Sequence, residues 1–139
     1  MSYTINQAIE ELKSLSEETP TKPELPNDSV LDEYELTINM ELPSEYRLFL
    51  KEASDVFVGY INPLLISKNK DSGNELLIAI YEARKLGLPN EWLPICEDNG
   101  DYYCIDSNGA VRFWSHNGFT NESWESLAFW IRDVWIAEA

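Results

Sequence analysis

Short hydrophobic runs alternate with turn residues between positions 93 and 116, and this stretch is the clearest structural signal in the chain. Asn99-Gly100 and Asn108-Gly109 each separate two runs that are rich in aromatic and β-branched residues. Asn-Gly favours the type I′ turn, with positive φ at both central residues, which joins antiparallel strands. The pattern therefore predicts a three-stranded meander with strands at residues 93–97, 102–106 and 110–115.

Successive side chains of a strand point to opposite faces, so the meander predicts two sets of neighbours. One face is expected to carry Tyr102, Cys104, Val111 and Phe113, and the other Tyr103, Ile105, Arg112 and Trp114. Both sets are apolar enough to predict helices over much of each face. A two-residue loop at Asn99-Gly100 also places Ile95 opposite Cys104, so that Cys96 and Cys104 point apart. Two buried free thiols are expected rather than a disulfide.

Apolar residues at helical spacing predict three helices in the N-terminal part of the chain. Thr4 and Gln7 form a capping box for the first helix, which is expected to end near Ser16. Pro20, Pro23 and Pro26 then predict an extended strap. The second helix is expected to start at a cap supplied by Ser29 or Asp28 and to end before Asn39, and the third is expected to have Pro43 in its first turn.

Residues 56–66 predict one or two strands broken near Gly59 and Pro63, and residues 68–73 predict a loop that is the main basic spot. A helix is expected over residues 74–86, ended by Gly87. Its inward residues are expected to be Leu76, Leu77, Ile80 and Tyr81.

The closing helix is expected to be capped by Asn121 and to dock on the sheet. Its apolar positions at helical spacing are Trp124, Leu127, Ala128, Ile131, Val134 and Trp135. The order of elements predicts a single α+β domain over residues 1–139, with a mainly antiparallel sheet flanked by helices that include the N- and C-terminal ones.

Charge narrows the classes of partner. The chain has 25 Asp and Glu against 10 Lys and Arg, a formal net charge of -15. That balance opposes binding to nucleic acid or to an anionic membrane, and it favours association with a basic partner. The alternative interpretation is that acidity only keeps the chain soluble. Neither a basic leader followed by an apolar run nor a membrane-length apolar segment is present in the sequence, so a cytoplasmic location is expected.

Candidate catalytic and metal-binding residues lack the patterns that such chemistry needs. Asp98 and Asp101 flank the Asn-Gly turn without the spacing of a Ca²⁺ loop, and they are expected to face and repel each other unless a cation or basic side chain lies there. His116 has no nucleophile elbow, and Cys96 and Cys104 have no basic neighbour that favours a thiolate. The sequence predicts no catalytic residue, no cofactor and no metal site.

Two segments carry a resemblance to a known family. The first is Leu-Pro-x-x-Tyr-x-x-Phe-Leu at residues 42–50, and the second combines Gly100-Asp101-Tyr102 with Asp106, Val111 and His116. In their order and spacing over residues 29–139 they resemble the SUKH superfamily, which includes SMI/KNR-like regulators of cell-wall synthesis and many bacterial proteins. Ala53-Ser54-Asp55 departs from the Asn-Gly-Gly-like turn that members often carry.

The resemblance implies a non-enzymatic protein-binding domain, because many bacterial members are similar to immunity proteins that bind and neutralise a toxin. Together with the charge it predicts a basic toxin domain as partner, a nuclease being one candidate. The binding residues are expected to be Asp98, Asp101, Tyr103, Asp106, Trp114 and His116. The alternative is a regulatory scaffold in cell-wall synthesis or signalling, and a third class is an enzyme or metal-binding protein. The identity of the partner and the oligomeric state stay open.

Overall fold

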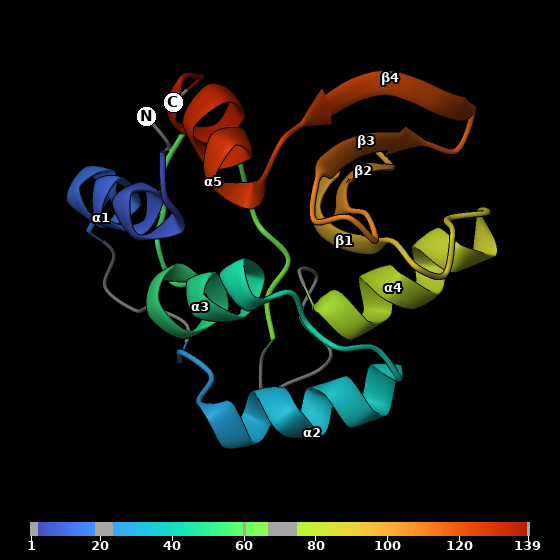
Figure 1. The fold of residues 1–139 in the computed structure, drawn as a ribbon, viewed down its shortest axis with the longest axis horizontal. Helices are drawn as coiled ribbons and strands as arrows, with labels where there is room; N and C mark the ends of the chain where they lie inside the picture. The colour runs from blue at the N-terminus through green and yellow to red at the C-terminus, as the bar shows by residue number, and fades with distance from the viewer. Residues whose placement is uncertain (1–2, 19–23, 60, 67–74, 139) are drawn as a thin grey trace.

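The computed structural model describes residues 3–18, 24–59, 61–66 and 75–138. Over these residues the chain is α+β, as predicted, with helices before and after one antiparallel sheet (Figure 1). The helices are α1 (Ile5–Leu15), α2 (Asp28–Ile38), α3 (Ser44–Ala53), α4 (Leu76–Lys85) and α5 (Leu127–Trp130), which continues into the π-helix η1 (Ile131–Ile136). The strands are β1 (Leu93–Asp98), β2 (Asp101–Ile105), β3 (Val111–Ser115) and β4 (Gly118–Trp124).

Local side-chain chemistry starts and ends the helices close to the predicted positions. The capping box of α1 is present, since Gln7 N donates to Thr4 Oγ1 and Thr4 N donates to Gln7 Oε1. Asn27, rather than Ser29 or Asp28, caps α2 by accepting a hydrogen bond from Val30 N. The positive φ of Asn39, 54°, ends that helix at the predicted residue.

Residues 75–86 differ from the prediction in two ways. The helix begins at Leu76 rather than at position 74, and Tyr81 is 64% exposed instead of facing inward. The segment 56–66 forms isolated bridges, Pro63 with Cys96 and Leu65 with Glu75, in place of the predicted strands. The predicted basic loop at 68–73 and the first two prolines of the strap lie outside the described residues.

The sheet has the order β1-β2-β3-β4, one strand more than predicted. The prediction of a helix capped by Asn121 was wrong, because residues 118–124 pair with β3 as an edge strand. Gly118, with φ of 140°, permits the reversal that starts this strand. Ser126 caps α5 instead, accepting a hydrogen bond from Phe129 N, and Trp124 therefore belongs to β4.

The two Asn-Gly pairs form different turns. Asn99 and Gly100 both have positive φ, 54° and 90°, and Asp98 pairs with Asp101, which confirms a type I′ hairpin. Asn108 is not among the residues with positive φ; only Gly109 is, at 87°. Asp106 N donates to the carbonyl of Ala110 at 2.9 Å, inside the pairing of Ile105 with Val111, so the second loop has the three residues 107–109.

This longer loop changes which side chains share a face of the sheet. The predicted grouping was wrong, because one extra loop residue moves every β3 side chain to the other face relative to β2. The observed pairs put Tyr102, Cys104, Arg112 and Trp114 on one face. They put Tyr103, Ile105, Val111 and Phe113 on the other.

A bulge at Ile95 also overturns the predicted pairing of Ile95 with Cys104. Pro94 pairs with Cys104 and Cys96 pairs with Tyr103, so the two cysteines still lie on opposite faces. Both are free and buried, as predicted. Burial is the main cause that raises the pKa of the Cys96 thiol to about 12, and it raises that of Cys104 further.

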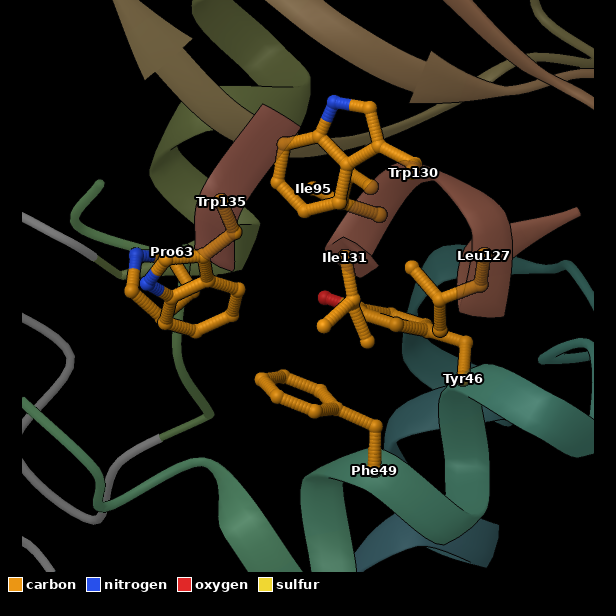
Figure 2. A pocket seen from close by; sticks show the side chains of 8 residues that line it. All are labelled: Tyr46, Phe49, Pro63, Ile95, Leu127, Trp130, Ile131 and Trp135. Carbon is orange, nitrogen blue, oxygen red and sulfur yellow. The ribbon is translucent and has the colours of Figure 1, made fainter. Parts of the chain in front are cut away.

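The helices lie in two groups around the sheet. α4 packs beside β1, whereas α1, α3 and α5 gather on the other side of the molecule (Figure 1). The Trp135 indole donates from Nε1 to the carbonyl of Val58 at 2.8 Å, which fixes η1 against the 56–58 segment. Figure 2 shows the cavity of about 10 Å³ that remains where α3 meets the C-terminal helix. Apolar side chains line this space, which has room for about one water molecule and is a packing gap rather than a ligand pocket.

Candidate protein-binding face of the sheet

Tyr103 lies at the centre of an aromatic cluster on one face of the sheet. Its ring centroid is 4.8 Å from that of Phe113 on β3, 5.7 Å from Trp124 on β4 and 5.2 Å from Trp130 on α5. Trp130 is buried, but Tyr103, Phe113 and Trp124 are each half-buried. These three rings therefore leave part of an apolar surface open to solvent.

The opening follows the course of β2. At its end Ile105 is buried opposite Val111, where the core covers the face. Two residues earlier the half-buried Tyr103 contacts Trp130 of α5, and a further two residues back Asp101 is half-buried beside the hairpin turn. The covering helices thus end near Tyr103, and the face beyond it is accessible.

Carboxylates surround the open part of this face. Asp98 and Asp101 pair across the type I′ turn and share the face of Tyr103. Burial, which is the largest cause, and the charges of Asp98, Glu122 and Glu138 together raise the pKa of the Tyr103 hydroxyl to about 12. We call this surface the acidic aromatic face: it consists of Tyr103, Phe113 and Trp124 with Asp98, Asp101, Glu122 and Glu138.

Most of these carboxylates have no cationic partner within the described part of the chain. Of the ion pairs formed there, none includes Asp98, Glu122 or Glu138. Within the described residues, Asp98 Oδ1 accepts a 3.3 Å hydrogen bond from the Asn99 side chain. Their negative field is therefore directed at solvent rather than cancelled inside the fold.

Asp101 is the exception, because His116 lies beside it. Asp101 Oδ1 is 3.0 Å from His116 Nδ1 and also accepts a 3.3 Å hydrogen bond from His116 N. The contact joins the β1–β2 turn to the β3–β4 turn. Solvent screening, a cation and a basic side chain were the possibilities left open for the facing Asp98 and Asp101, and the exposed His116 is a basic side chain beside Asp101.

The structure brings together four of the six residues predicted to bind a partner and separates two. Asp98, Asp101, Tyr103 and His116 lie at one end of the sheet, as described above. Trp114 is buried on the opposite face, 6.2 Å from the Tyr102 ring. Asp106 lies in the β2–β3 loop at the far end of the strands.

Asp106 has an intramolecular role there. Its Oδ1 accepts hydrogen bonds from Asn108 N at 2.9 Å and Ala110 N at 3.1 Å, and its Oδ2 is 3.5 Å from Arg112 Nη1. Such an Asx arrangement closes a loop in place of a backbone turn. One carboxylate oxygen is therefore engaged by the loop amides, and the other lies beside Arg112 of β3.

Four residues of the face were not predicted to belong to it. Phe113 was assigned to the other face through the wrong loop length, and Trp124 was assigned to a helix. Had residues 118–124 been interpreted as a strand, their alternation would have placed Glu122 beside Trp124. Glu138 follows η1, and its charge acts on Tyr103 because of the tertiary packing of that helix, which no local sequence signal predicts.

The second concentration of acid, on α2, is largely neutralised inside the fold. Arg47 on α3 is 2.7 Å from Asp32, 3.1 Å from Asp28 and 3.3 Å from Glu35, and Lys51 is 3.1 Å from Asp28. Hydrogen bonds from Lys51 and then Arg47 lower the pKa of Asp28. These ion pairs join α2 to α3, so this surface has less uncompensated charge than the number of its carboxylates indicates.

Two other features, a metal-binding cluster and a membrane-spanning helix, are absent from the described residues. No group of three or more His, Cys, Asp and Glu side chains there is arranged to hold a metal ion. No described helix is both long enough and apolar enough to cross a membrane.

Comparison with known proteins places the chain in a family. A crystal structure of a protein from Pseudomonas syringae pv. tomato superimposes with a TM-score of 0.88 at 37% sequence identity, covering 95% of this chain and 98% of that one. A comparison with curated proteins gives no significant match. Residues 5–136 match the family SUKH_5, described as SMI1-KNR4 cell-wall. The resemblance inferred from the sequence is thereby confirmed, and the chain belongs to the SMI1-KNR4 (SUKH) family.

Proposed function

We propose that this chain is a non-enzymatic immunity protein of the cytoplasm, which binds the basic domain of a cognate toxin and blocks it. The observation that carries the proposal is the acidic aromatic face, where Asp98, Glu122 and Glu138 act on a half-exposed Tyr103 and have no cationic partner among the described residues. Family membership supports the proposal at the coarser level of a shared fold and family role.

The two components of the face have different physical effects on binding. Carboxylates directed at solvent, on a chain of net charge -15, accelerate encounter with a basic partner and disfavour acidic ones. Half-exposed aromatic rings supply the apolar contact that holds a complex after encounter, as aromatic residues do at the centre of many interfaces. The proposed toxin domain therefore has a binding surface with basic residues around an apolar centre that can pack against aromatic rings.

The side chains best suited to catalysis support a non-enzymatic role. Both thiols are buried with raised pKa values, which disfavours the reactive thiolate. His116 is oriented by Asp101, but the nearby Ser115 hydroxyl accepts a hydrogen bond from Asn117 N in the same turn.

The test begins by identifying the genes beside the one that encodes this chain and purifying the product of a toxin-like gene among them. Isothermal titration of the purified pair is expected to give tight binding at 1:1 stoichiometry, with affinity falling as salt concentration rises. Co-expression is expected to relieve the toxicity. Absence of binding and of protection overturns the proposal. Charge reversal by Asp98→Lys with Asp101→Lys is expected to slow association.

One observation favours a second candidate, a regulatory scaffold in cell-wall synthesis or signalling. The matched family is described by the words cell-wall. Capture of a cell-wall synthesis component by the wild-type chain, combined with no effect on the neighbouring toxin, would support the scaffold and contradict the immunity role.

A further inference from the structure

We propose that the acidic aromatic face receives an arginine side chain of the basic partner, with the guanidinium beside the Tyr103 hydroxyl and between Asp98, Glu122 and Glu138. This inference rests on the proposed function and gives it a recognition mode. The occupant is an arginine-bearing segment of the partner, and the place of contact does not depend on the toxin's identity.

The arrangement of charges favours one cation rather than a diffuse basic surface. The three carboxylates come from separate parts of the fold: Asp98 ends β1, Glu122 lies in the middle of β4, and Glu138 follows η1. Asp98 pairs with Asp101, which lies two residues from Tyr103 on the same face, and Glu122 stands two residues before Trp124, whose ring centroid is 5.7 Å from that of Tyr103. Together with Glu138 these carboxylates also raise the pKa of the Tyr103 hydroxyl. A cation at this point interacts favourably with all three.

The rings favour arginine over lysine. A guanidinium is planar, stacks on aromatic rings and presents a fork of donors to carboxylates, whereas an ammonium is a compact and strongly hydrated point charge. Tyr103, Phe113 and Trp124 offer half-exposed rings beside the carboxylates. Ring and carboxylate together match both recognition elements of arginine.

The same chain already uses this combination twice. Arg112 lies 5.2 Å from the Trp92 ring centroid and 3.5 Å from the Asp106 carboxylate. Arg132 lies 4.6 Å from the Phe129 ring centroid and 2.7 Å from the Asp133 carboxylate. At Tyr103 the rings and carboxylates are present, but no arginine of the described chain pairs with those carboxylates.

The test uses a defined probe in place of the unidentified toxin. A capped Gly-Arg-Gly-Arg-Gly peptide is titrated into the isotopically labelled chain, and backbone amide shifts are followed by NMR. The expected perturbations are at residues 98–104, 113 and 122–124, with an affinity at least about tenfold above that of the citrulline analogue, which keeps the shape but loses the charge. Shifts that are spread evenly over α2 and the sheet, or equal binding of the citrulline peptide, overturn the inference.

Matched variants separate a specific site from net charge. Asp98→Asn with Glu122→Gln is expected to weaken peptide binding by at least about fivefold, whereas Glu33→Gln with Glu41→Gln, which removes the same charge at exposed positions in and after α2, is expected to change it by less than about twofold. All four positions are exposed, so circular dichroism is expected to report unchanged folding. Equal weakening by both pairs contradicts the site.

The outcome for the site and the outcome for the proposed function are distinguishable. If the toxin binds but the arginine peptide does not perturb the face, the arginine site is wrong and the immunity function stands. If the peptide binds at the face but the toxin neither binds nor is neutralised, the immunity function is wrong and the arginine site stands.

Discussion

Replacing Asp106 with alanine removes the acceptor that closes the β2–β3 loop. The carboxylate receives two backbone hydrogen bonds, from Asn108 N at 2.9 Å and Ala110 N at 3.1 Å. Hydrogen bonds to a charged group contribute about 1.5–3 kcal/mol each. In the variant the amide of the exposed Asn108 can bond to water, which offsets part of its loss, whereas the amide of the half-buried Ala110 regains less. The free energy of unfolding is therefore expected to fall by about 2 kcal/mol, which lowers Tm by about 5–10 °C.

Urea unfolding followed by tryptophan fluorescence measures this loss, and Asp106→Asn is the matched control. Asparagine keeps the Oδ1 acceptor for both amides and loses only the charge next to Arg112, so its cost is expected to stay below about 1 kcal/mol. Binding of the toxin is expected to be unchanged in both variants below their unfolding transitions. If Asp106→Ala leaves the free energy of unfolding unchanged, or if it weakens toxin binding without lowering that free energy, the intramolecular role is refuted. The second result would also place Asp106 in the binding interface.

Three other predictions concern the core and the titration of buried groups. Tyr34→Phe removes the 2.6 Å hydrogen bond to the buried Glu75 carboxylate, so the free energy of unfolding is expected to fall by about 1.5–3 kcal/mol. The control Tyr81→Phe, at an exposed position, is expected to lower it by less than about 0.5 kcal/mol. Similar losses in the two variants would contradict this role of Tyr34. Cys96 and Cys104 are expected to resist Ellman's reagent until the chain unfolds, and rapid native labelling would oppose the burial assigned to them. Tyr103 has a folded pKa of about 12, raised by burial and by Asp98, against about 10 when unfolded. The unfolded state therefore loses this proton first, so the stabilisation is present below about pH 10 and is lost as pH rises towards 12. Urea unfolding is expected to show wild-type stability falling more steeply than that of Tyr103→Phe above about pH 10, and parallel curves would contradict the shift.

Features fixed by a few neighbouring residues could be predicted from the sequence. The capping box at Thr4 and the type I′ turn at Asn99-Gly100 both depend on contacts within about four positions, and both are present. The positive φ at Gly87, 111°, likewise follows the end of α4 as predicted. The α+β class followed from the order of such local elements.

Features that depend on competition between local signals were predicted wrongly. Asn108-Gly109 is the same dipeptide as Asn99-Gly100, but Asp106 stands two residues before it and binds the loop amides, which favours a three-residue loop. The one extra residue in the β2–β3 loop places Phe113 on the face of Tyr103, instead of the predicted face of Tyr102. Trp124 and Leu127 are three positions apart, a spacing that fits one face of a helix. Only the pairing of β4 with β3 shows that Trp124 belongs to a strand.

The candidate site was predictable only in part for the same reason. Asp98, Asp101 and Tyr103 belong to one hairpin, so their proximity followed from the turn. His116 joined them through the β3–β4 turn, while Glu138 arrives from the end of the chain by tertiary packing. Trp114 and Asp106 were included because they are near in sequence, and alternation and loop chemistry place them elsewhere.

The central claim, that the acidic aromatic face is where a basic partner docks, is tested most directly by association kinetics with the neighbouring toxin. Stopped-flow fluorescence compares wild type with Asp98→Lys/Glu122→Lys and with the control Glu33→Lys/Glu41→Lys, which makes the same change in net charge near α2, away from β4 (Figure 1). The account predicts that the first pair slows association by at least about tenfold at low salt and the control by less than about threefold. Equal rates for the two pairs would contradict it.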